Sequence, residues 1–189
     1  MIDPEILLGA YAQGLFPMGM PNGEIGWFSP DPRGILPLDE RFHVPRGLAR
    51  RLKKNPFEIR YSTAFEEVMA GCAEREETWI DPEIARSYHA LHELGYAHSV
   101  ETWREGQLVG GLYGVALGGA FFGESMFHRE TDASKVALYH LVQHLREREF
   151  SLLDIQWTTP HLETFGAIAI PRQEYLRRLR RAIREDRVF

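Results

Sequence analysis

Three polar side chains are of types that can hold and orient reacting groups, and each lies in an apolar part of the chain. Asp154 and Gln156 are two residues apart in the otherwise apolar run 152–157. Residues two apart on a β-strand point to the same face, so this carboxylate and this amide could hold one ligand together. Glu124 follows a glycine-rich apolar stretch, 108–123. The alternative for the Asp-x-Gln pair is a solvated strand face, which the apolar neighbours disfavour.

The glycine-rich stretch 108–127 is typical of a backbone that approaches another group closely. Glycine lacks the side chain that would collide with a ligand or a second strand, which favours a functional cleft. The alternative is a tight hairpin that turns at 117–119, and both can hold at once. Strict alternation would place Glu124 on the same side as Phe122 and Met126, where a carboxyl needs a partner. A salt bridge from Glu124 to Lys135 is the structural alternative to a role in a site.

The chain offers few residues for covalent or metal chemistry. Its one cysteine, Cys72, excludes an internal disulfide and a zinc site built mainly on thiolates. Cys72 falls at helical spacing with Phe65 and Met69 and is predicted to be a small core residue. His140 and His144 have i,i+4 spacing, but no zincin glutamate or third ligand accompanies them. We therefore expect no metal and no cofactor.

The composition describes a globular chain with localised positive charge. Its 189 residues suffice for one compact domain with a smaller N-terminal piece. No apolar run approaches the roughly 20 residues that cross a bilayer, and the first residues lack a signal-peptide pattern, which predicts a cytoplasmic location. The net charge is −5, yet basic residues cluster at 46–54 and 172–187. Such clusters are usually solvated helix faces, but on an acidic protein they also indicate contact with a polyanion such as a nucleic-acid backbone.

The N-terminal part, residues 1–56, is predicted to be a short helix followed by a packed segment. Asp3 and Pro4 have the order of an N-cap and a first helical residue, and Gly14 is placed to end the helix. Residues 16–38 are rich in proline, glycine and aromatic residues. This pattern is incompatible with long regular elements and predicts an ordered loop.

Residues 57–189 are predicted to form the main domain. Helices are expected after a cap at Ser62 or Thr63, from Asp81 to Gly95, after a cap at Asp132, near Leu162 and at the arginine-rich C-terminus. Strands are expected at 57–61, 97–103, 108–116, 120–126, 151–157 and 168–170, with an antiparallel meander in the middle. This order predicts an α+β fold: an acetyltransferase-like α/β sandwich with a mixed, largely antiparallel sheet and a small N-terminal segment.

Several motifs occur together and in order along residues 7–176. They are Ala10–Pro17, Trp27–Arg33, Phe42–Val44, Thr78–Ile80, Leu91–Glu101, Gly123–Phe127, Ala133–Lys135 and Leu153–Gln156. Together they closely resemble the leucyl/phenylalanyl-tRNA protein transferase family. The resemblance implies an aminoacyltransferase that moves leucine or phenylalanine (or methionine) from aminoacyl-tRNA to the N-terminal arginine or lysine of a protein. The new peptide bond would create an N-degron for the bacterial N-end rule of protein degradation, and no cofactor would be needed.

The resemblance also implies catalytic roles for the three polar residues. Asp154 and Gln156 match the pair at the family's reaction centre, so we expect Asp154 to steady the attacking amine and Gln156 to hydrogen-bond near the carbonyl. Glu124 matches an acid that lies beside the aminoacyl group and can hold an ammonium. Either a side chain or the tRNA ribose could assist the proton transfer. Attack by an amine on an ester requires orientation and polarisation but no nucleophilic side chain.

Binding residues follow from the same resemblance. The pocket for the aminoacyl side chain is expected to be lined by Phe121, Met126, Leu141 and Ile155, although Met126 and Leu141 taken alone could simply be core. Trp79 matches an aromatic residue that stacks near the terminal adenosine, with a core tryptophan as the alternative. The expected contacts for tRNA phosphates are Arg50, Arg51, Lys53 and Lys54, while the C-terminal arginines could be merely solvated.

Two other functions remain open at this point. A coenzyme A dependent N-acyltransferase of the same fold would need a glycine-rich phosphate loop, which is not evident. A noncatalytic tRNA-binding module would be expected to lack the Asp-x-Gln pair, which this chain keeps. Position 128 is a histidine where a small polar residue is common in longer relatives, and the sequence assigns it no role.

Overall fold

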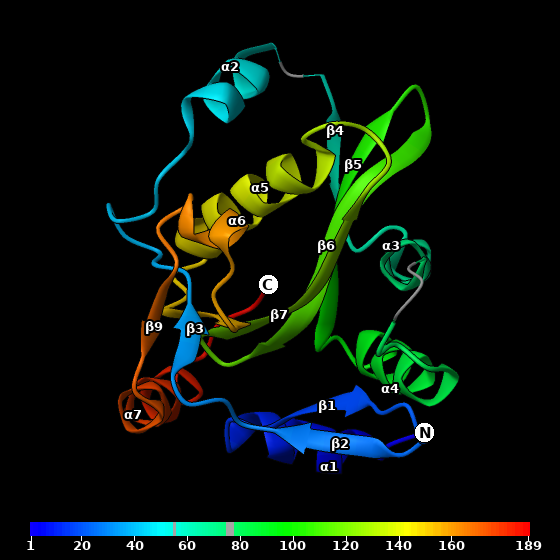
Figure 1. Ribbon diagram of the computed structural model, residues 1–189, viewed down its shortest axis with the longest axis vertical. Coiled ribbons are helices and arrows are strands. Elements are labelled where there is room, and N and C mark those ends of the chain that lie inside the picture. Colours follow the sequence, from blue (N-terminus) through cyan, green and yellow to red (C-terminus); the bar gives the residue numbers. More distant parts are fainter. Residues whose placement is uncertain (55, 75–77) are drawn as a thin grey trace.

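A seven-stranded sheet organises the protein, as seen in a computed structural model that describes residues 1–54, 56–74 and 78–189 (Figure 1). The strand order is β4-β5-β6-β7-β8-β3-β9. Neighbouring strands are antiparallel except β7 and β8, which are parallel. The predicted α+β class and the mixed, largely antiparallel sheet are therefore confirmed. The strands are β3 (Arg33–Ile35), β4 (Glu58–Tyr61), β5 (Ala97–Arg104), β6 (Gln107–Leu117), β7 (Ala120–His128), β8 (Leu152–Gln156) and β9 (Ile168–Ile170).

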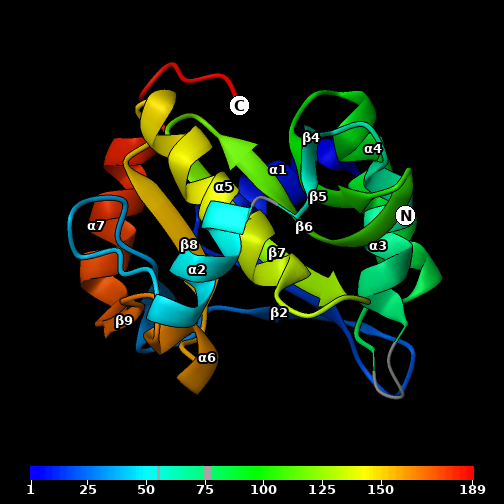
Figure 2. The same ribbon diagram turned by 90° about the horizontal axis from the view of Figure 1, so that it is seen from above.

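Helices cover both faces of the sheet, as Figures 1 and 2 show. One apolar cluster joins the sheet to α5, α6 and α2, and a second joins it to α1, α3, α4 and α7. Cys72 is buried in the second cluster, as predicted. Among the described residues, no helix is long and apolar enough to cross a membrane. The helices are α1 (Pro4–Ala12), α2 (Arg46–Lys54), α3 (Phe65–Ala73), α4 (Pro82–Glu93), α5 (Ala133–Glu147), α6 (Pro160–Glu163) and α7 (Arg172–Ala182).

Local sequence signals determine the starts of α1 and α4. The Asp3 carboxylate accepts hydrogen bonds from the backbone N–H groups of Glu5 and Ile6, and Pro4 is the first helical residue. Asp81 caps α4 in the same way by accepting from Ile84 N–H, and Pro82 follows it. These caps satisfy N–H groups that have no partner within the helix, so both predicted helix starts are confirmed.

Two other predicted caps are wrong. The N-terminus of α3 has no side-chain cap from Ser62 or Thr63; Glu101 of β5 instead accepts from the backbone N–H groups of Thr63 and Ala64. Asp132 precedes α5 with φ of 68° and makes no capping bond, because its carboxylate pairs with Lys135 at 3.0 Å. At α3 the N–H groups are bound by Glu101, which is distant in sequence, whereas at α5 the competing partner is Lys135 in the first turn of the same helix.

The prediction of a loop at 16–38 is wrong in part, because this segment contains three short strands. β1 (Phe16–Gly19) and β2 (Ile25–Phe28) form a hairpin, and β3 enters the main sheet between β8 and β9. Gly34 of β3 lies so close to β8 that an added Cβ would be 2.6 Å from the Trp157 carbonyl carbon. These three strands carry prolines and glycines, such as Pro17, Gly26 and Gly34, which obscure an apolar alternation, so the sequence pattern did not reveal them.

Most glycines in 108–127 serve the packing of the sheet. β6 and β7 form the predicted hairpin, with Gly118 and Gly119 between the strands. A Cβ on Gly114 would overlap the carbonyl oxygen of Phe122 and the Phe121 ring. Gly123 is the glycine of this stretch that lines the site cavity described below. The hairpin alternative therefore accounts for most of the pattern, and the cleft involves its last part.

Candidate functional site

A fork between β7 and β8 creates the site. The two strands pair side by side as far as Phe122 and Asp154, after which β7 continues to His128 alongside β6. A β-bulge lies at the fork: Gly123 faces Gly114 and Ser125 faces Tyr113, which leaves Glu124 without a counterpart. A bulge bends its strand and redirects a side chain. It therefore separates β7 from β8 and turns Glu124 towards the opening.

The bulge also corrects the predicted direction of the side chains around Glu124. Phe122 packs in the cluster of α1, α3 and α4, whereas Met126 packs against the cluster of α5 and α6. The two residues therefore lie on opposite faces of the sheet, and the prediction that they share a side with Glu124 is wrong. One inserted residue shifts the alternation by one, and the sequence alone does not mark that insertion.

A cavity of about 270 Å³ lies in the fork. Its walls are mostly apolar and come from β7, β8, α5 and α6, and its polar groups include Glu124, Gln156 and His161. This combination is typical of a site that binds an apolar group and orients it with a few hydrogen bonds. The lining residues are Trp79, Leu112, Tyr113, Gly123, Glu124, Ser125, Met126, Leu138, Leu141, Leu153, Ile155, Gln156, Thr159, His161 and Leu162.

The cavity brings together most of the residues singled out from the sequence. Its lining includes Trp79, Met126, Leu141, Ile155, Glu124 and Gln156. Phe121 is not among the lining residues; it is fully buried in the cluster that also contains Leu141, with its ring centroid 5.2 Å from that of Phe189. Asp154 is also outside the lining and is 1% exposed. These two residues therefore lie behind the wall of the cavity.

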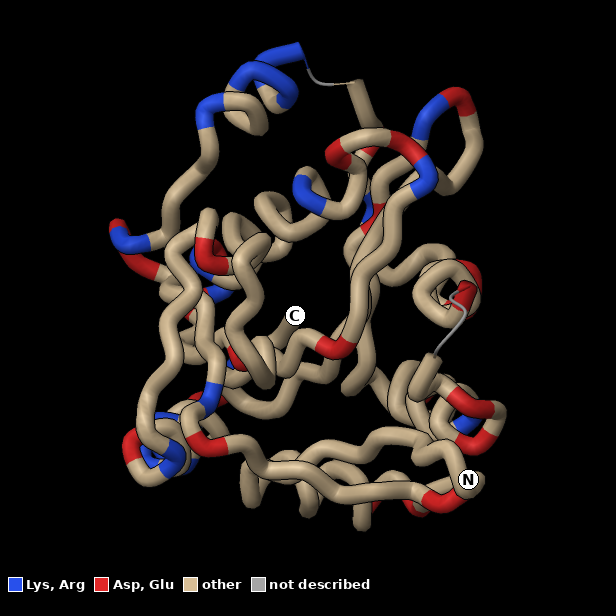
Figure 3. Tube along the Cα trace, viewed as in Figure 1, with Lys and Arg blue, Asp and Glu red and all other residues tan. Residues whose placement is uncertain are grey.

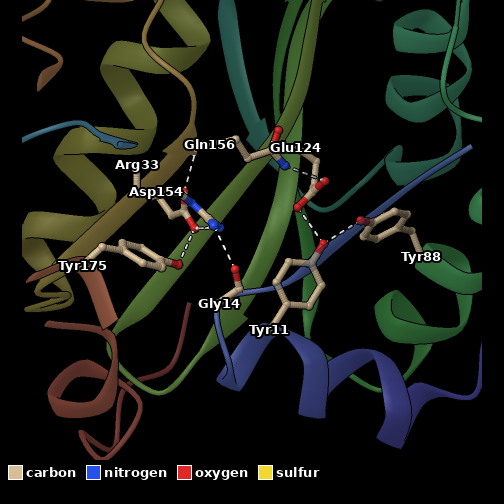
Figure 4. Close-up of polar contacts among 8 residues, drawn as sticks. All are labelled: Tyr11, Gly14, Arg33, Tyr88, Glu124, Asp154, Gln156 and Tyr175. Carbon is tan, nitrogen blue, oxygen red and sulfur yellow. Dashed lines mark hydrogen bonds and ion pairs between the residues drawn. The ribbon is translucent and has the colours of Figure 1, made fainter. Parts of the chain in front are cut away.

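Asp154 is held by four hydrogen bonds (Figure 4). Arg33 donates from Nε to Oδ1 at 3.0 Å and from Nη2 to Oδ2 at 2.7 Å. The backbone N–H of Gln156 donates to Oδ1 at 2.8 Å, and the Tyr175 hydroxyl donates to Oδ2 at 2.6 Å. Each carboxylate oxygen thus accepts two hydrogen bonds, which compensate a buried charge for the loss of water.

Arg33 is a site residue to which sequence reasoning assigned no role. It is fully buried, and its Nη1 donates to the carbonyl oxygen of Gly14 at 2.8 Å. Its guanidinium carbon lies 4.8 Å from the Phe16 ring centroid and 4.4 Å from that of Tyr175. Burial opposes its charge, but the attraction of Asp154 raises the pKa of Arg33 above its usual value. The only sequence signal was its place at the end of the motif Trp27–Arg33.

Glu124 is the second buried carboxyl of the site, and it is 8% exposed. The Tyr11 hydroxyl donates to its Oε1 at 2.6 Å, and Gln156 Nε2 donates to its Oε2 at 3.2 Å. The Tyr11 and Tyr88 hydroxyl oxygens are 2.5 Å apart and extend this network to α4. Burial raises the pKa of Glu124 to about 7, aided by the charge of Asp154 and opposed by hydrogen bonds from Tyr11, Tyr88 and Gln156. The suggested salt bridge to Lys135 is wrong, because Lys135 pairs with Asp132.

Gln156 connects the two networks (Figure 4). Its backbone N–H is bound by Asp154, and its side-chain amide reaches Glu124. Its φ of 66° lies in the left-handed region, which is uncommon for a residue with a side chain. Such a conformation persists only when surrounding contacts hold it, and Asp154 supplies one of them. The buried carboxylate therefore helps to fix where Gln156 presents its amide.

The arrangement suits a ligand with an apolar side chain, an ammonium group and a reactive carbonyl. The apolar walls can hold the side chain. The Glu124 carboxyl can attract the ammonium group, and the neighbouring Gln156 amide can hydrogen-bond to the carbonyl. In the described part of the chain, no group of three or more His, Cys, Asp or Glu residues could hold a metal ion.

Helix α2 carries the basic residues predicted to contact phosphates. Arg50, Lys53 and Lys54 are exposed, and Figure 3 shows the helix as a blue segment apart from the main sheet. Leu48 is buried and attaches the helix to the α5 side of the core. Arg51 Nη2 donates to the carbonyl oxygen of Thr131 at 3.2 Å, so Arg51 is partly engaged in the protein itself.

Sequence comparisons identify closely similar proteins. A family model described as leucyl/phenylalanyl-tRNA protein transferase matches residues 35–180, and the model of that family's N-terminal domain matches residues 1–31. A leucyl/phenylalanyl-tRNA–protein transferase of Akkermansia muciniphila is 58% identical over 189 residues, covering 98% of both chains. Proteins of the same description from Herpetosiphon aurantiacus and Rubrobacter xylanophilus are 54% and 55% identical, each covering 100% of this chain and 98% of the relative.

Solved structures with a similar arrangement are much more distant in sequence. A ribosomal-protein-alanine N-acetyltransferase from Brucella melitensis biovar Abortus 2308 gives a TM-score of 0.41 at 17% identity, covering 57% of this chain and 84% of that one. A GCN5-related N-acetyltransferase-like protein from Streptococcus suis 89/1591 gives 0.40 at 14% identity, covering 88% and 63%.

Proposed function

Because this chain belongs to the leucyl/phenylalanyl-tRNA protein transferase family, we propose that it moves leucine or phenylalanine (or methionine) from tRNA to the N-terminal arginine or lysine of an acceptor protein. The observation that carries the proposal is the apolar cavity lined also by Glu124 and Gln156. The product is an acceptor protein with a new N-terminal residue, which marks it for degradation in the bacterial cytoplasm.

The distribution of apolar and polar groups in the cavity suggests how the donor is oriented. The aminoacyl side chain lies among Met126, Leu141 and Ile155, which leaves its ammonium and ester carbonyl near the polar groups. Trp79 is half-buried and also lines the cavity, where its indole can stack on the terminal adenosine. An apolar pocket of this kind selects by size and rejects polar side chains, because a buried polar group without a partner is unfavourable.

The reaction joins the acceptor's α-nitrogen to the ester carbonyl carbon and releases the ribose oxygen of tRNA. The nitrogen loses a proton, and the ribose oxygen gains one as the ester C–O bond breaks. Glu124, when ionised, attracts the ammonium of the donor or acceptor, and the Gln156 amide hydrogen-bonds near the carbonyl. The proton passes either through these side chains or through a neighbouring ribose hydroxyl.

Asp154 is a positioning residue in this proposal. Both its oxygens already accept two hydrogen bonds each, so it has no free position for an attacking amine. Its contribution reaches the reaction through the backbone of Gln156 and through its negative charge. This revises the expectation from sequence that Asp154 contacts the amine itself.

The function is tested by transfer of radiolabelled leucine from charged tRNA to a peptide that begins with arginine, with acetyl coenzyme A as a rival donor. We expect transfer from tRNA only, and a loss of at least about 100-fold in Gln156→Ala, since one misplaced or missing orienting group can have that effect. A matched variant, Gln173→Ala, changes an exposed glutamine on α7 and should transfer normally. Transfer from coenzyme A alone, or from neither donor, would overturn the proposal.

Leu141 is expected to set the size limit of the side-chain cavity. It is 1% exposed and lies on α5 against the cavity. Leu141→Phe should lower kcat/KM for phenylalanyl-tRNA at least about tenfold more than for leucyl-tRNA, because the larger donor side chain no longer fits. Leu141→Met keeps the volume and should leave the preference nearly unchanged. Steady-state transfer with the two charged tRNAs measures the ratio, and an equal loss for both would exclude Leu141 from side-chain selection.

The exposed lysines of α2 are expected to bind donor phosphates. Lys53→Ala/Lys54→Ala should raise the Kd for aminoacyl-tRNA and reduce the slope of log Kd against log salt by about one per lost contact. Arg177→Ala/Arg181→Ala removes two exposed charges from α7 and serves as the matched control. Filter binding at several salt concentrations distinguishes them. Equal effects of the two double variants would indicate a general charge effect in place of a specific contact.

A further inference from the structure

Two further hollows connect the site cavity to α2. The first, of about 380 Å³, shares Met126 and His161 with the site cavity and is also lined by His128, Lys135 and Thr131. The second, of about 290 Å³, shares Lys135 and His161 with the first and reaches Gly47 and Leu48 in the first turn of α2. We call these two connected hollows the α5 groove. It is a continuous surface path from the reaction site to the basic helix.

The α5 groove is lined by hydrogen-bond donors. The Lys135 side chain is 41% exposed, and among the described residues one ion pair, to Asp132, engages its ammonium group. An ammonium has three N–H donors, so two can bind a ligand. His128 is exposed, and its Nδ1 is 3.5 Å from the Ser134 hydroxyl. Its other ring nitrogen, Nε2, is not part of that contact and can face a ligand in the groove. His161 adds a ring N–H at the point where the groove meets the cavity.

A phosphate in the groove would compete with Asp132 for the Lys135 ammonium group. Asp132 lines both hollows and neutralises Lys135 when the groove is empty. The pair is partly exposed, with side chains 41% and 22% accessible, so a phosphate can compete for the ammonium group. Burial, together with the charge of Lys135, lowers the pKa of His161 and so favours its neutral ring, which carries one N–H donor.

The position of the groove points to one occupant. Its inner end opens to the cavity proposed for the aminoacyl group, and its outer end reaches the first turn of α2, the helix that carries the exposed basic residues. Arg51 also binds the Thr131 carbonyl, which ties α2 to the loop that lines the groove. A nucleic acid whose end is in the cavity and whose stem contacts α2 must cross this surface.

We propose that the unpaired 3′-terminal nucleotides of the donor lie in the α5 groove, with Lys135 bound to a backbone phosphate and His128 and His161 beside the neighbouring nucleotides. The inference rests on the proposed function. It assigns a binding surface to the part of the donor that lies between the aminoacyl group and the stem. It also gives a role to His128 and Lys135, which the reaction itself does not use.

Donors of increasing length test this path. They are a leucyl ester of adenosine, which has no backbone phosphate, a leucylated cytidine-cytidine-adenosine trinucleotide, and leucyl-tRNA. Lys135→Ala should lower kcat/KM for the trinucleotide and for tRNA about tenfold more than for the adenosine ester, the usual effect of losing one charged hydrogen bond. Lys135→Arg keeps the charge and should therefore retain most of the kcat/KM that Lys135→Ala loses with the trinucleotide and with tRNA. Lys53→Ala/Lys54→Ala should affect tRNA alone.

The outcomes separate this inference from the function on which it rests. If Lys135→Ala lowers kcat/KM equally for all three donors, Lys135 acts on the fold or the chemistry and the groove assignment is overturned. If it lowers none of them, the nucleotides follow another path and the assignment is equally overturned. Failure of the unaltered protein to use leucyl-tRNA, with transfer from coenzyme A, would instead overturn the proposed function. Thermal melting of each variant checks that it folds.

Discussion

Replacement of Arg33 by methionine is expected to lower the free energy of unfolding by about 3–5 kcal/mol, the usual effect of removing one partner of a buried ion pair. The side chains of Arg33 and Asp154 are each 1% exposed, so Asp154 would remain as a buried charge without its main partner. The change also removes the donor to the Gly14 carbonyl. Urea unfolding of the variant and the unaltered protein measures the difference.

An exposed arginine provides the matched control. Arg41 forms an ion pair with Asp39 at 2.6 Å, but the two side chains are 56% and 42% exposed. Arg41→Met should therefore change the free energy of unfolding far less than Arg33→Met does. If Arg33→Met and Arg41→Met had similar effects, the buried pair would not be a main support of the fold.

A double variant separates the fold from the activity. Arg33→Met/Asp154→Leu removes both charges, and a buried pair replaced by apolar residues commonly retains its stability. We expect the double variant to be more stable than Arg33→Met alone, with clear non-additivity between the two positions. Transfer should stay at least about 100-fold below normal, because the Gln156 N–H has lost the acceptor that positions its amide. Normal transfer by a stable double variant would show that Asp154 does not position Gln156.

Replacement of Glu124 by glutamine is expected to change how stability depends on pH. The pKa of Glu124 is raised from 4.5 to about 7 by burial. The folded protein therefore binds a proton more tightly than the unfolded chain, and this contribution to stability is lost as pH rises from about 4.5 to about 7. A shift of this size corresponds to about 3 kcal/mol. Glutamine does not titrate, so Glu124→Gln should lack this part of the decline.

Urea unfolding between pH 4.5 and 8 measures the effect. The difference in free energy of unfolding between Glu124→Gln and the unaltered protein should move in favour of the variant by up to about 3 kcal/mol as pH rises, and it should level off above about pH 7. Parallel curves across this range would show that Glu124 titrates alike in the folded and unfolded states.

The same titration should affect the transfer rate in the opposite sense. Ionised Glu124 attracts an ammonium group, so activity that depends on it should increase as pH rises through about 7. The acceptor amine also titrates, near pH 8, but its effect cancels in the ratio of the rates of the unaltered protein and Glu124→Gln. That ratio should rise about tenfold from pH 6 to pH 8. A ratio independent of pH would exclude ionised Glu124 from ammonium binding.

Helices and hairpins with strong local signals were predictable from the sequence. The caps at Asp3 and Asp81 and the apolar face of α3 act over a few residues, so their effect can be recognised without the rest of the chain. The caps predicted for α3 and α5 failed because Glu101 and Lys135 supplied competing partners. Short strands such as β3 carried no pattern and depended on the neighbours that they joined.

The candidate site was predictable only in part. Motif resemblance selected Glu124, Gln156 and the apolar residues Met126, Leu141 and Ile155, which the structure brings to one cavity. Phe121 is placed behind the wall because it precedes the bulge. The bulge depends on how β7 pairs with β6, and such pairing depends on contacts distant in sequence.

By itself, the sequence determined the family and most helices and hairpins, because these follow from motifs and from contacts between near neighbours. Only the tertiary structure decided that Asp154 faces Arg33 and Tyr175 in place of a ligand, and that Glu124 faces Tyr11 and Gln156. The Arg33 and Tyr11 contacts join residues more than a hundred positions apart. Asp154 and Glu124 become buried only when the strands assemble around the fork between β7 and β8, and this burial raises the pKa of Glu124.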